Sequence, residues 1–253
     1  MHSAALAAMG LGGEWTYEAI EVSAEGFDEL VRSLPARDFA GVNVTIPHKL
    51  RALAIADDAS DAAREIGAAN TLTFAHGRIA AENTDAEGII GSLPCSPEGK
   101  SALVMGAGGS ARAAIWALRE AGAQVSVWNR TESKARALAS EFGVGAGARP
   151  SEIVVNATSV GLESPGTEGQ HLSGRRVPNL KHLPVFDDCP QVEVVLDLVY
   201  ASKETDLILA AKAADVIAVG GLEVLARQGA ASLRVWTGKD PPLETMRRAA
   251  EAP

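Results

Sequence analysis

The stretch Ser101–Ala113, which reads SALVMGAGGSARA, decides the fold. Ser101–Met105 is short and apolar, as expected for a buried strand, and a helical pattern follows directly. Gly106 permits a tight turn between the two elements, and Gly108 lets a pyrophosphate approach the backbone. The small Ala113 allows the helix to pack closely on the strand. The order of strand, glycine turn and helix therefore predicts a dinucleotide-binding loop, whose phosphates lie at the helix N-terminus.

The next predicted strand ends about twenty residues later, where an NAD enzyme places an Asp or Glu against the ribose 2′-hydroxyl. This chain has Asn129-Arg130-Thr131 at that point, with Lys134 one turn into the following helix. A guanidinium binds a 2′-phosphate through charge-assisted hydrogen bonds, whereas a carboxylate would repel it. The pattern favours NADP over NAD, although solvated surface charge is an alternative interpretation of Arg130 and Lys134.

The rest of the chain also alternates between strands and helices, which predicts an α/β fold with a parallel sheet in its second region. The expected strands are 14–22, 41–45, 70–74, 78–82, 101–105, 124–129, 152–156 and 192–198. The expected helices are 3–11, 26–34, 61–66, 109–122, 133–142, 222–236 and 243–250. Residues 163–190 are rich in Gly, Pro and His and are expected to form a long loop.

Composition excludes several classes of protein. The chain has 253 residues, enough for one large or two modest domains, and its apolar runs are too short to span a bilayer. A net charge of -9 argues against nucleic-acid or anionic-membrane partners. Two distant cysteines and five histidines without ligand spacing predict no disulfide framework, no metal site and a cytoplasmic location.

A second group of polar residues marks a candidate chemical site. Thr45 and Lys49 follow the strand that begins at Gly41, Asn70 precedes another strand, and Asp85 follows a third. Lys, Asp, Asn and Thr at strand ends suit a hydroxyl-rich ligand and proton transfer. Ordinary turn and cap chemistry explains the same residues equally well.

The motifs, taken in order, resemble the shikimate dehydrogenase family over nearly the whole chain. They are GVNVTIPHK (41–49), GAANT (67–71), NTD (83–85), GAGGSARA (106–113), WNRT (128–131), NATSVGL (156–162), DLVY (197–200), GGLEVLARQG (220–229) and WTG (236–238).

This resemblance implies the reduction of 3-dehydroshikimate to shikimate by NADPH in aromatic amino acid biosynthesis, by a monomer or homodimer. It implies a substrate-binding catalytic domain at 1–86, with 227–253 packing back onto it, and an NADP-binding Rossmann domain at 87–226, with a cleft between the two domains. Lys49 and Asp85 would be catalytic. The implied substrate ligands are Thr45, Asn70, Asp85, Tyr200 and Gln228. The implied cofactor ligands are Gly106, Ala107, Gly108, Gly109, Ser110, Asn129, Arg130, Thr131, Lys134, Leu198, Gly221 and Asp61.

The sequence departs from the family pattern in its first residues. The family carries carboxylate-binding serines and a strand before the position that Met1-His2-Ser3 occupies here, so we expect residues upstream of Met1. Ser202 and Val224 stand where the family commonly has proline and methionine.

Two alternatives stay open at this point. One is a quinate/shikimate dehydrogenase with broader substrate or cofactor use. The other is a catalytically weak or silent NADP-binding paralogue, which the absent serines favour and the intact Lys49 and Asp85 oppose.

Overall fold

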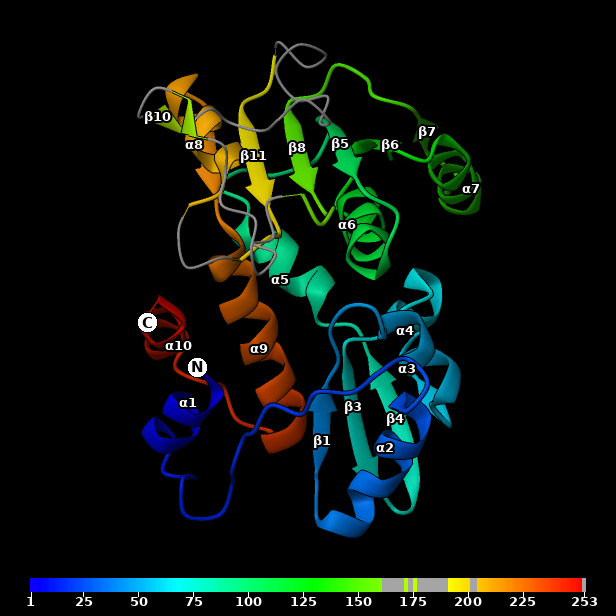
Figure 1. Ribbon diagram of the computed structural model, residues 1–253, viewed down its shortest axis with the longest axis vertical. Coiled ribbons are helices and arrows are strands. Elements are labelled where there is room, and N and C mark those ends of the chain that lie inside the picture. The colour runs from blue at the N-terminus through cyan, green and yellow to red at the C-terminus, as the bar shows by residue number, and fades with distance from the viewer. Residues whose placement is uncertain (161–170, 173–174, 177–190, 201–203, 252–253) are drawn as a thin grey trace. The chain divides into compact units, whose positions relative to one another are not determined.

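The computed structural model describes residues 1–160, 171–172, 175–176, 191–200 and 204–251 of the chain (Figure 1). These residues form two compact units. The first comprises Met1–Gly88 and Leu225–Ala252, and the second comprises Ile89–Val224.

The helices of the described part are α1 (His2–Ala8), α2 (Phe27–Ser33), the 3-10 helix η1 (Leu34–Arg37), α3 (Lys49–Ile55), α4 (Asp61–Ile66), α5 (Asp85–Ser92), α6 (Gly109–Glu120), α7 (Glu132–Phe142), α8 (Asp206–Ala213), α9 (Gly221–Thr237) and α10 (Leu243–Glu251). Its strands are β1 (Gly41–Asn43), β2 (Asp58–Ala59), β3 (Thr71–Ala75), β4 (Arg78–Glu82), β5 (Ser101–Met105), β6 (Gln124–Trp128), β7 (Gly145–Ala146), β8 (Ile153–Asn156), β9 (His171–Leu172), β10 (Arg175–Arg176), β11 (Val194–Asp197) and β12 (Ile217–Val219).

The first unit is built on a mixed four-stranded sheet in the order β1-β3-β4-β2. Strands β3 and β4 form an antiparallel hairpin across His76 and Gly77, whose φ angles of 53° and 72° suit the tight turn that matches strand twist. Short local signals bound the helix that precedes it. The Ser60 hydroxyl accepts from the Ala63 amide at the start of α4, and Gly67 ends that helix with φ 69°.

Two apolar clusters stabilise the first unit by burial. One lies among α2, α3 and the sheet and contains Phe27, Val31, Ile55, Leu72 and Ile79. The other joins α1, α9 and α10 through Leu6, Leu233 and Met246. Helix α9 therefore belongs to the same core as the beginning of the chain, although more than 200 positions separate them.

The second unit is a parallel six-stranded sheet in the order β12-β11-β8-β5-β6-β7. Figure 1 labels its strands β11, β8, β5, β6 and β7. The predicted α/β class is confirmed, and β5 has the predicted bounds because its apolar run is buried almost throughout. In a parallel sheet all strands end at the same edge, so the residues after β5, β6, β8 and β11 gather there. Among the described residues, no helix is long and apolar enough to cross a membrane.

The prediction of a strand at 14–22 is wrong. The structure has turns and irregular backbone there, and β1 pairs with β3. The apolar and aromatic residues of this segment satisfy strand propensity, but a strand requires a hydrogen-bonded neighbour, which propensity does not supply. Helices α5 and α8 and strands β2, β7 and β12 were not predicted. The predicted loop of 163–190 lies outside the described residues, apart from β9 and β10.

Candidate functional site

Lys49 and Asp85 form an ion pair in the first unit. Lys49 begins α3 and Asp85 begins α5, and the Nζ of Lys49 lies 2.6 Å from Oδ2 of Asp85. Their side chains are only 11% and 9% exposed, so water screens the pair weakly. A carboxylate in the first turn of a helix is also stabilised by the helix dipole, whereas a lysine there is not. Asp85 therefore offsets an unfavourable position for the Lys49 charge.

Asn70 extends this pair with a side-chain amide whose orientation is determined by its neighbours. Its Oδ1 lies 2.7 Å from the backbone N–H of Thr84, a group that can only donate. The Nδ2 group must therefore point the other way, where it lies 3.0 Å from Oδ1 of Asp85. The side chain is almost fully buried, at 2% exposed, so it cannot rotate into water.

Gln228 of α9 continues the same chain of hydrogen bonds. Its Nε2 donates to the backbone carbonyl of Leu225 at 3.0 Å, so its Oε1 faces Asn70 and accepts from Nδ2 at 3.0 Å. Donation thus runs from Gln228 to Leu225, from Asn70 to both Gln228 and Asp85, and from Lys49 to Asp85. Four predicted site residues, from α3, α5, α9 and the position just before β3, come together in this way.

Other predicted residues of the first unit stand apart from this chain. Thr45 is exposed in the turn before α3, and its backbone carbonyl accepts from the His48 amide. Asp61 lies in the first turn of α4, where its carboxylate is 94% exposed and pairs with Arg64. Neither side chain is part of the chain of hydrogen bonds that joins Lys49, Asp85, Asn70 and Gln228.

The predicted dinucleotide loop follows β5 in the second unit. Gly106 has φ 124°, and a Cβ there would lie 2.6 Å from the carbonyl oxygen of Ala157. Only glycine permits both this backbone conformation and this close approach. Gly108 is the N-cap of α6 and has open space where a Cβ would be. Because glycine has no side chain, it makes no side-chain capping hydrogen bond to the helix. The first amides of α6 therefore lack a side-chain cap from this position, as an anion site at a helix N-terminus requires.

The predicted ribose-phosphate residues follow β6. The side-chain Nδ2 of Asn129 donates to the backbone carbonyl of Thr131 at 3.0 Å, and this hydrogen bond spans the turn into α7. Arg130, Thr131 and Lys134 are exposed. Among the described residues, no carboxylate forms an ion pair with Arg130 or Lys134.

A buried carboxylate, Asp197, was not predicted as part of the site. It ends β11 with no exposed surface, and burial raises its pKa. The carboxylate accepts from Asn156 at 2.8 Å, from the Val199 amide at 3.1 Å and from the Thr205 hydroxyl at 2.5 Å. It therefore joins the ends of β8 and β11 to the cap of α8.

Two predicted residues, Leu198 and Tyr200, follow Asp197 directly, and a third, Gly221, packs against the same segment. Leu198 is half-buried, and Tyr200 is 45% exposed. Gly221 begins α9, and a Cβ there would lie 2.6 Å from the Val199 carbonyl oxygen. Glycine at 221 is thus needed for the helix to approach this segment.

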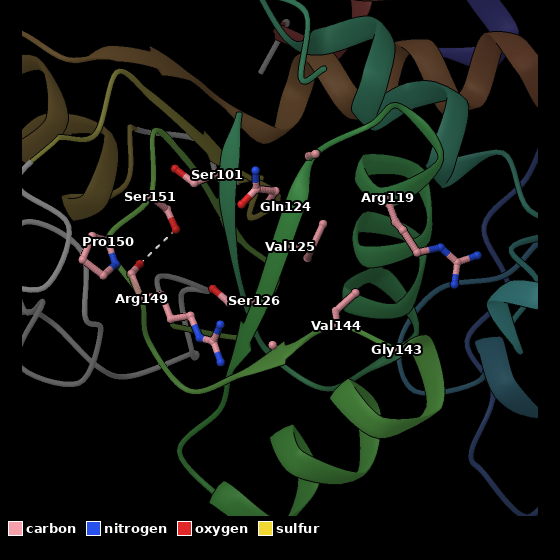
Figure 2. A pocket seen from close by; sticks show the side chains of 12 residues that line it. Ser101, Arg119, Gln124, Val125, Ser126, Gly143, Val144, Arg149, Pro150 and Ser151 are labelled. Atoms are coloured by element: carbon pink, nitrogen blue, oxygen red, sulfur yellow. Dashed lines mark hydrogen bonds between the residues drawn. The ribbon is translucent and has the colours of Figure 1, made fainter. Parts of the chain in front are cut away.

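A pocket of about 350 Å³ in the second unit contains none of the predicted residues (Figure 2). It is lined by Ser101 and Gln124, which begin β5 and β6, so it opens at the amino ends of these strands. Ligands of open parallel sheets bind at the carboxyl ends instead. The guanidinium of Arg119, which also lines the pocket, donates hydrogen bonds to the Glu120 carboxylate and to the Phe142 carbonyl. We therefore do not assign the chemistry to this pocket.

Comparison with known families matches three segments of the chain. Residues 1–72 match the shikimate dehydrogenase substrate binding domain, and residues 90–157 match shikimate / quinate 5-dehydrogenase. Residues 221–251 match the shikimate 5′-dehydrogenase C-terminal domain.

Individual relatives agree over almost the full length. The NADP(+) shikimate dehydrogenase of Thermus thermophilus is 41% identical over 99% of this chain and 91% of its own. The enzyme of the same name from Methanothermobacter thermautotrophicus is 37% identical over 97% of this chain and 88% of its own. A crystal structure of the Thermus thermophilus enzyme with NADP(H) and shikimate superposes with a TM-score of 0.83, at 40% identity, covering 98% of this chain and 91% of that one.

Proposed function

The chain belongs to the shikimate dehydrogenase family. We propose that it reduces 3-dehydroshikimate to shikimate with NADPH in aromatic amino acid biosynthesis. It is an NADP-dependent shikimate dehydrogenase by its relationship to enzymes of that name. The observation that supports the reaction most strongly is the buried pair of Lys49 and Asp85, extended in a defined direction by Asn70 and Gln228.

The two catalytic side chains have separate roles in this proposal. Negative charge develops on the ketone oxygen as the ring carbon is reduced, and the Lys49 ammonium stabilises that charge and donates the proton. Asp85 orients Lys49 through Oδ2 and accepts from Asn70 through Oδ1. A carboxylate has about four acceptor positions, so Asp85 can also accept from a ring hydroxyl.

The remaining substrate ligands would hold ring oxygens. We assign this role to Thr45, Asn70, Tyr200 and Gln228. A hydroxyl-rich ring needs both donors and acceptors, and the exposed hydroxyls of Thr45 and Tyr200 supply both.

The residues after β5 and β6 suit NADP. A Cβ at position 106 would clash with the carbonyl oxygen of Ala157, so only glycine leaves this space open beside the loop. Gly106, Ala107, Gly108, Gly109 and Ser110 would bind the pyrophosphate, and Asn129, Arg130, Thr131 and Lys134 would bind the ribose phosphate. Leu198 and Gly221 would lie near the nicotinamide, and Asp61 would make a further contact. Bound NADPH supplies the hydride equivalent for the reduction.

Shikimate-dependent reduction of NADP⁺, assayed beside quinate and NAD⁺, tests the proposal. We expect turnover with shikimate and NADP⁺ to exceed every other combination. Equal rates with quinate or NAD⁺ would instead support a quinate/shikimate dehydrogenase. NADP binding without turnover of either acid would support the silent paralogue.

Replacement of Arg130 by Ala is expected to weaken NADP binding by at least about tenfold, or about 1.4 kcal/mol, because the 2′-phosphate loses a charge-assisted partner. NAD affinity should change little, since NAD lacks that phosphate. Calorimetric titration of both cofactors measures the difference. Arg136→Ala is a matched control, because Arg136 is an exposed arginine of α7 that pairs with Glu132. Equal losses of NAD and NADP affinity in Arg130→Ala would contradict the assignment.

A further inference from the structure

Ser232 lies one turn after Gln228 on α9, with its side chain fully buried. Its hydroxyl donates to the Gln228 backbone carbonyl at 3.0 Å and accepts from Nδ2 of Asn43 at 2.8 Å. The hydroxyls of Thr71 and Thr84 lie 2.8 Å and 3.1 Å away. A hydroxyl has one proton and two lone pairs, so with the proton given to Gln228 and one lone pair to Asn43, the second lone pair accepts from either Thr71 or Thr84.

The partners of Ser232 come from three separate segments. Asn43 ends β1 and Thr71 begins β3, and these two residues face each other in the sheet register. Thr84 immediately precedes α5, which begins at Asp85. One hydroxyl of α9 therefore joins two strands to the segment that carries Asp85.

Asn70 is one hydrogen bond further along this network. The hydroxyls of Thr71 and Thr84 each lie 3.2 Å from Oδ1 of Asn70, and Nδ2 of Asn70 lies 2.9 Å from Oγ1 of Thr84. The two threonine hydroxyls thus lie within hydrogen-bond distance of both ends of the Asn70 amide. The Ser232 hydroxyl in turn lies within hydrogen-bond distance of both threonine hydroxyls and accepts from one of them at a time.

Helix α9 has a second attachment to the sheet that does not involve Ser232. Nε1 of Trp236 donates to the Leu72 carbonyl at 3.1 Å. Gly41 makes room for this ring, since a Cβ there would lie 2.3 Å from Nε1 of Trp236. Removal of the Ser232 hydroxyl should therefore disturb the polar network without releasing the helix.

From this network we infer that Ser232 is a positioning residue, which holds the Asn70 amide in place against Asp85 and Gln228 through the hydroxyls of Thr71 and Thr84, while the backbone N–H of Thr84 sets the direction of that amide. The inference rests on the proposed function, because Asn70, Asp85 and Gln228 are there the ligands of shikimate. Ser232 itself does not touch the substrate. Its effect reaches shikimate only through Asn70 and its neighbours.

The first test is Ser232→Ala in the full chain. The dissociation constant of shikimate should rise about tenfold. The dissociation constant of NADP should not change, because its proposed ligands, apart from Asp61, belong to the second unit. Titration calorimetry measures both, and steady-state kinetics should show the rise in KM for shikimate. Thr237→Ala is the matched control, since Thr237 makes the same type of bond to a carbonyl four residues earlier but is absent from the network.

Coupling to Asn70 separates positioning from a general loss of stability. If Ser232 acts through Asn70, then Ser232→Ala should have little further effect on shikimate affinity in an Asn70→Ala background. Independent additive losses of shikimate affinity would show that Ser232 does not act through Asn70 and would overturn the inference.

A second variant covers the case in which Ser232→Ala does not fold. Thr71→Val removes the neighbouring hydroxyl with little change of shape, and it should give the same rise in the shikimate dissociation constant. Unchanged shikimate affinity in the folded variants, with an active parent chain, overturns the role of Ser232 alone. A parent chain that neither binds nor oxidises shikimate overturns the proposed function, and the inference falls with it.

Discussion

Replacement of Lys49 by Met is expected to lower the turnover of shikimate by roughly 10²–10⁴, the range for loss of a positioned proton donor. The methionine keeps most of the apolar stem of lysine and removes the ammonium that lies 2.6 Å from Asp85. Shikimate affinity should change much less, because Asn70 and Gln228 are retained. Steady-state rates and calorimetric titration of shikimate measure the two quantities.

The Lys49→Met variant also leaves the Asp85 carboxylate without its cation in a mostly buried position. Such a change costs stability, so the loss of turnover needs a control for misfolding. The double variant Lys49→Met/Asp85→Asn removes the uncompensated charge and should recover part of the free energy of unfolding while turnover stays low. A folded Lys49→Met variant with near-normal turnover would move the proton transfer to another residue.

Replacement of Gly106 by Ala is expected to have the second large effect. The new Cβ would lie 2.6 Å from the Ala157 carbonyl oxygen, and alanine would have to adopt φ 124°. We expect the free energy of unfolding to fall by about 2–4 kcal/mol from strain and overpacking. NADP affinity should fall by about 100-fold, or about 2.7 kcal/mol, because the loop can no longer hold its conformation. Denaturant titration and calorimetry measure these losses.

Two other glycines separate the causes. Gly143 has φ 66° and open space around its Cβ position, so Gly143→Ala should cost about 1–2 kcal/mol of stability and leave NADP affinity unchanged. Gly108 has an ordinary backbone conformation and open space, so Gly108→Ala should lower NADP affinity with little loss of stability. NADP affinity in Gly106→Ala equal to that of the parent chain would refute the predicted loop.

The first strand and helix of the second unit could be predicted closely from the sequence because their signals are local. An apolar run, a glycine turn and a helical period are contiguous from Ser101 onward, and β5 and α6 begin at the predicted residues. The strand predicted at 14–22 failed because strand formation depends on pairing with another segment. Helix α8 was missed although Thr205 caps it, because the Ser/Thr signal is short and lies beside a segment without clear periodicity.

The chemical site was predicted in its parts and not in its connections. Lys49, Asn70, Asp85 and Gln228 were identified individually, three of them at element ends and Gln228 from its motif. Their hydrogen bonds join residues up to 158 positions apart, and spacing along the chain carries no signal for such contacts. Ser232 was missed for the same reason, since a serine at a helical position resembles an ordinary core or surface residue. Asp197 was missed because its partners lie on another strand and on the cap of α8.

Isotope transfer tests whether the chain reduces a ring ketone by hydride transfer from NADPH. The chain would be incubated with 3-dehydroshikimate and NADPH carrying deuterium at the transferable position of the nicotinamide, and the product analysed by mass spectrometry. We expect shikimate that contains one deuterium on the newly formed carbinol carbon, and at least about 100-fold less of this product from the Lys49→Met variant at matched times. Shikimate formed without deuterium, or no shikimate from a folded chain that binds both ligands, would contradict it.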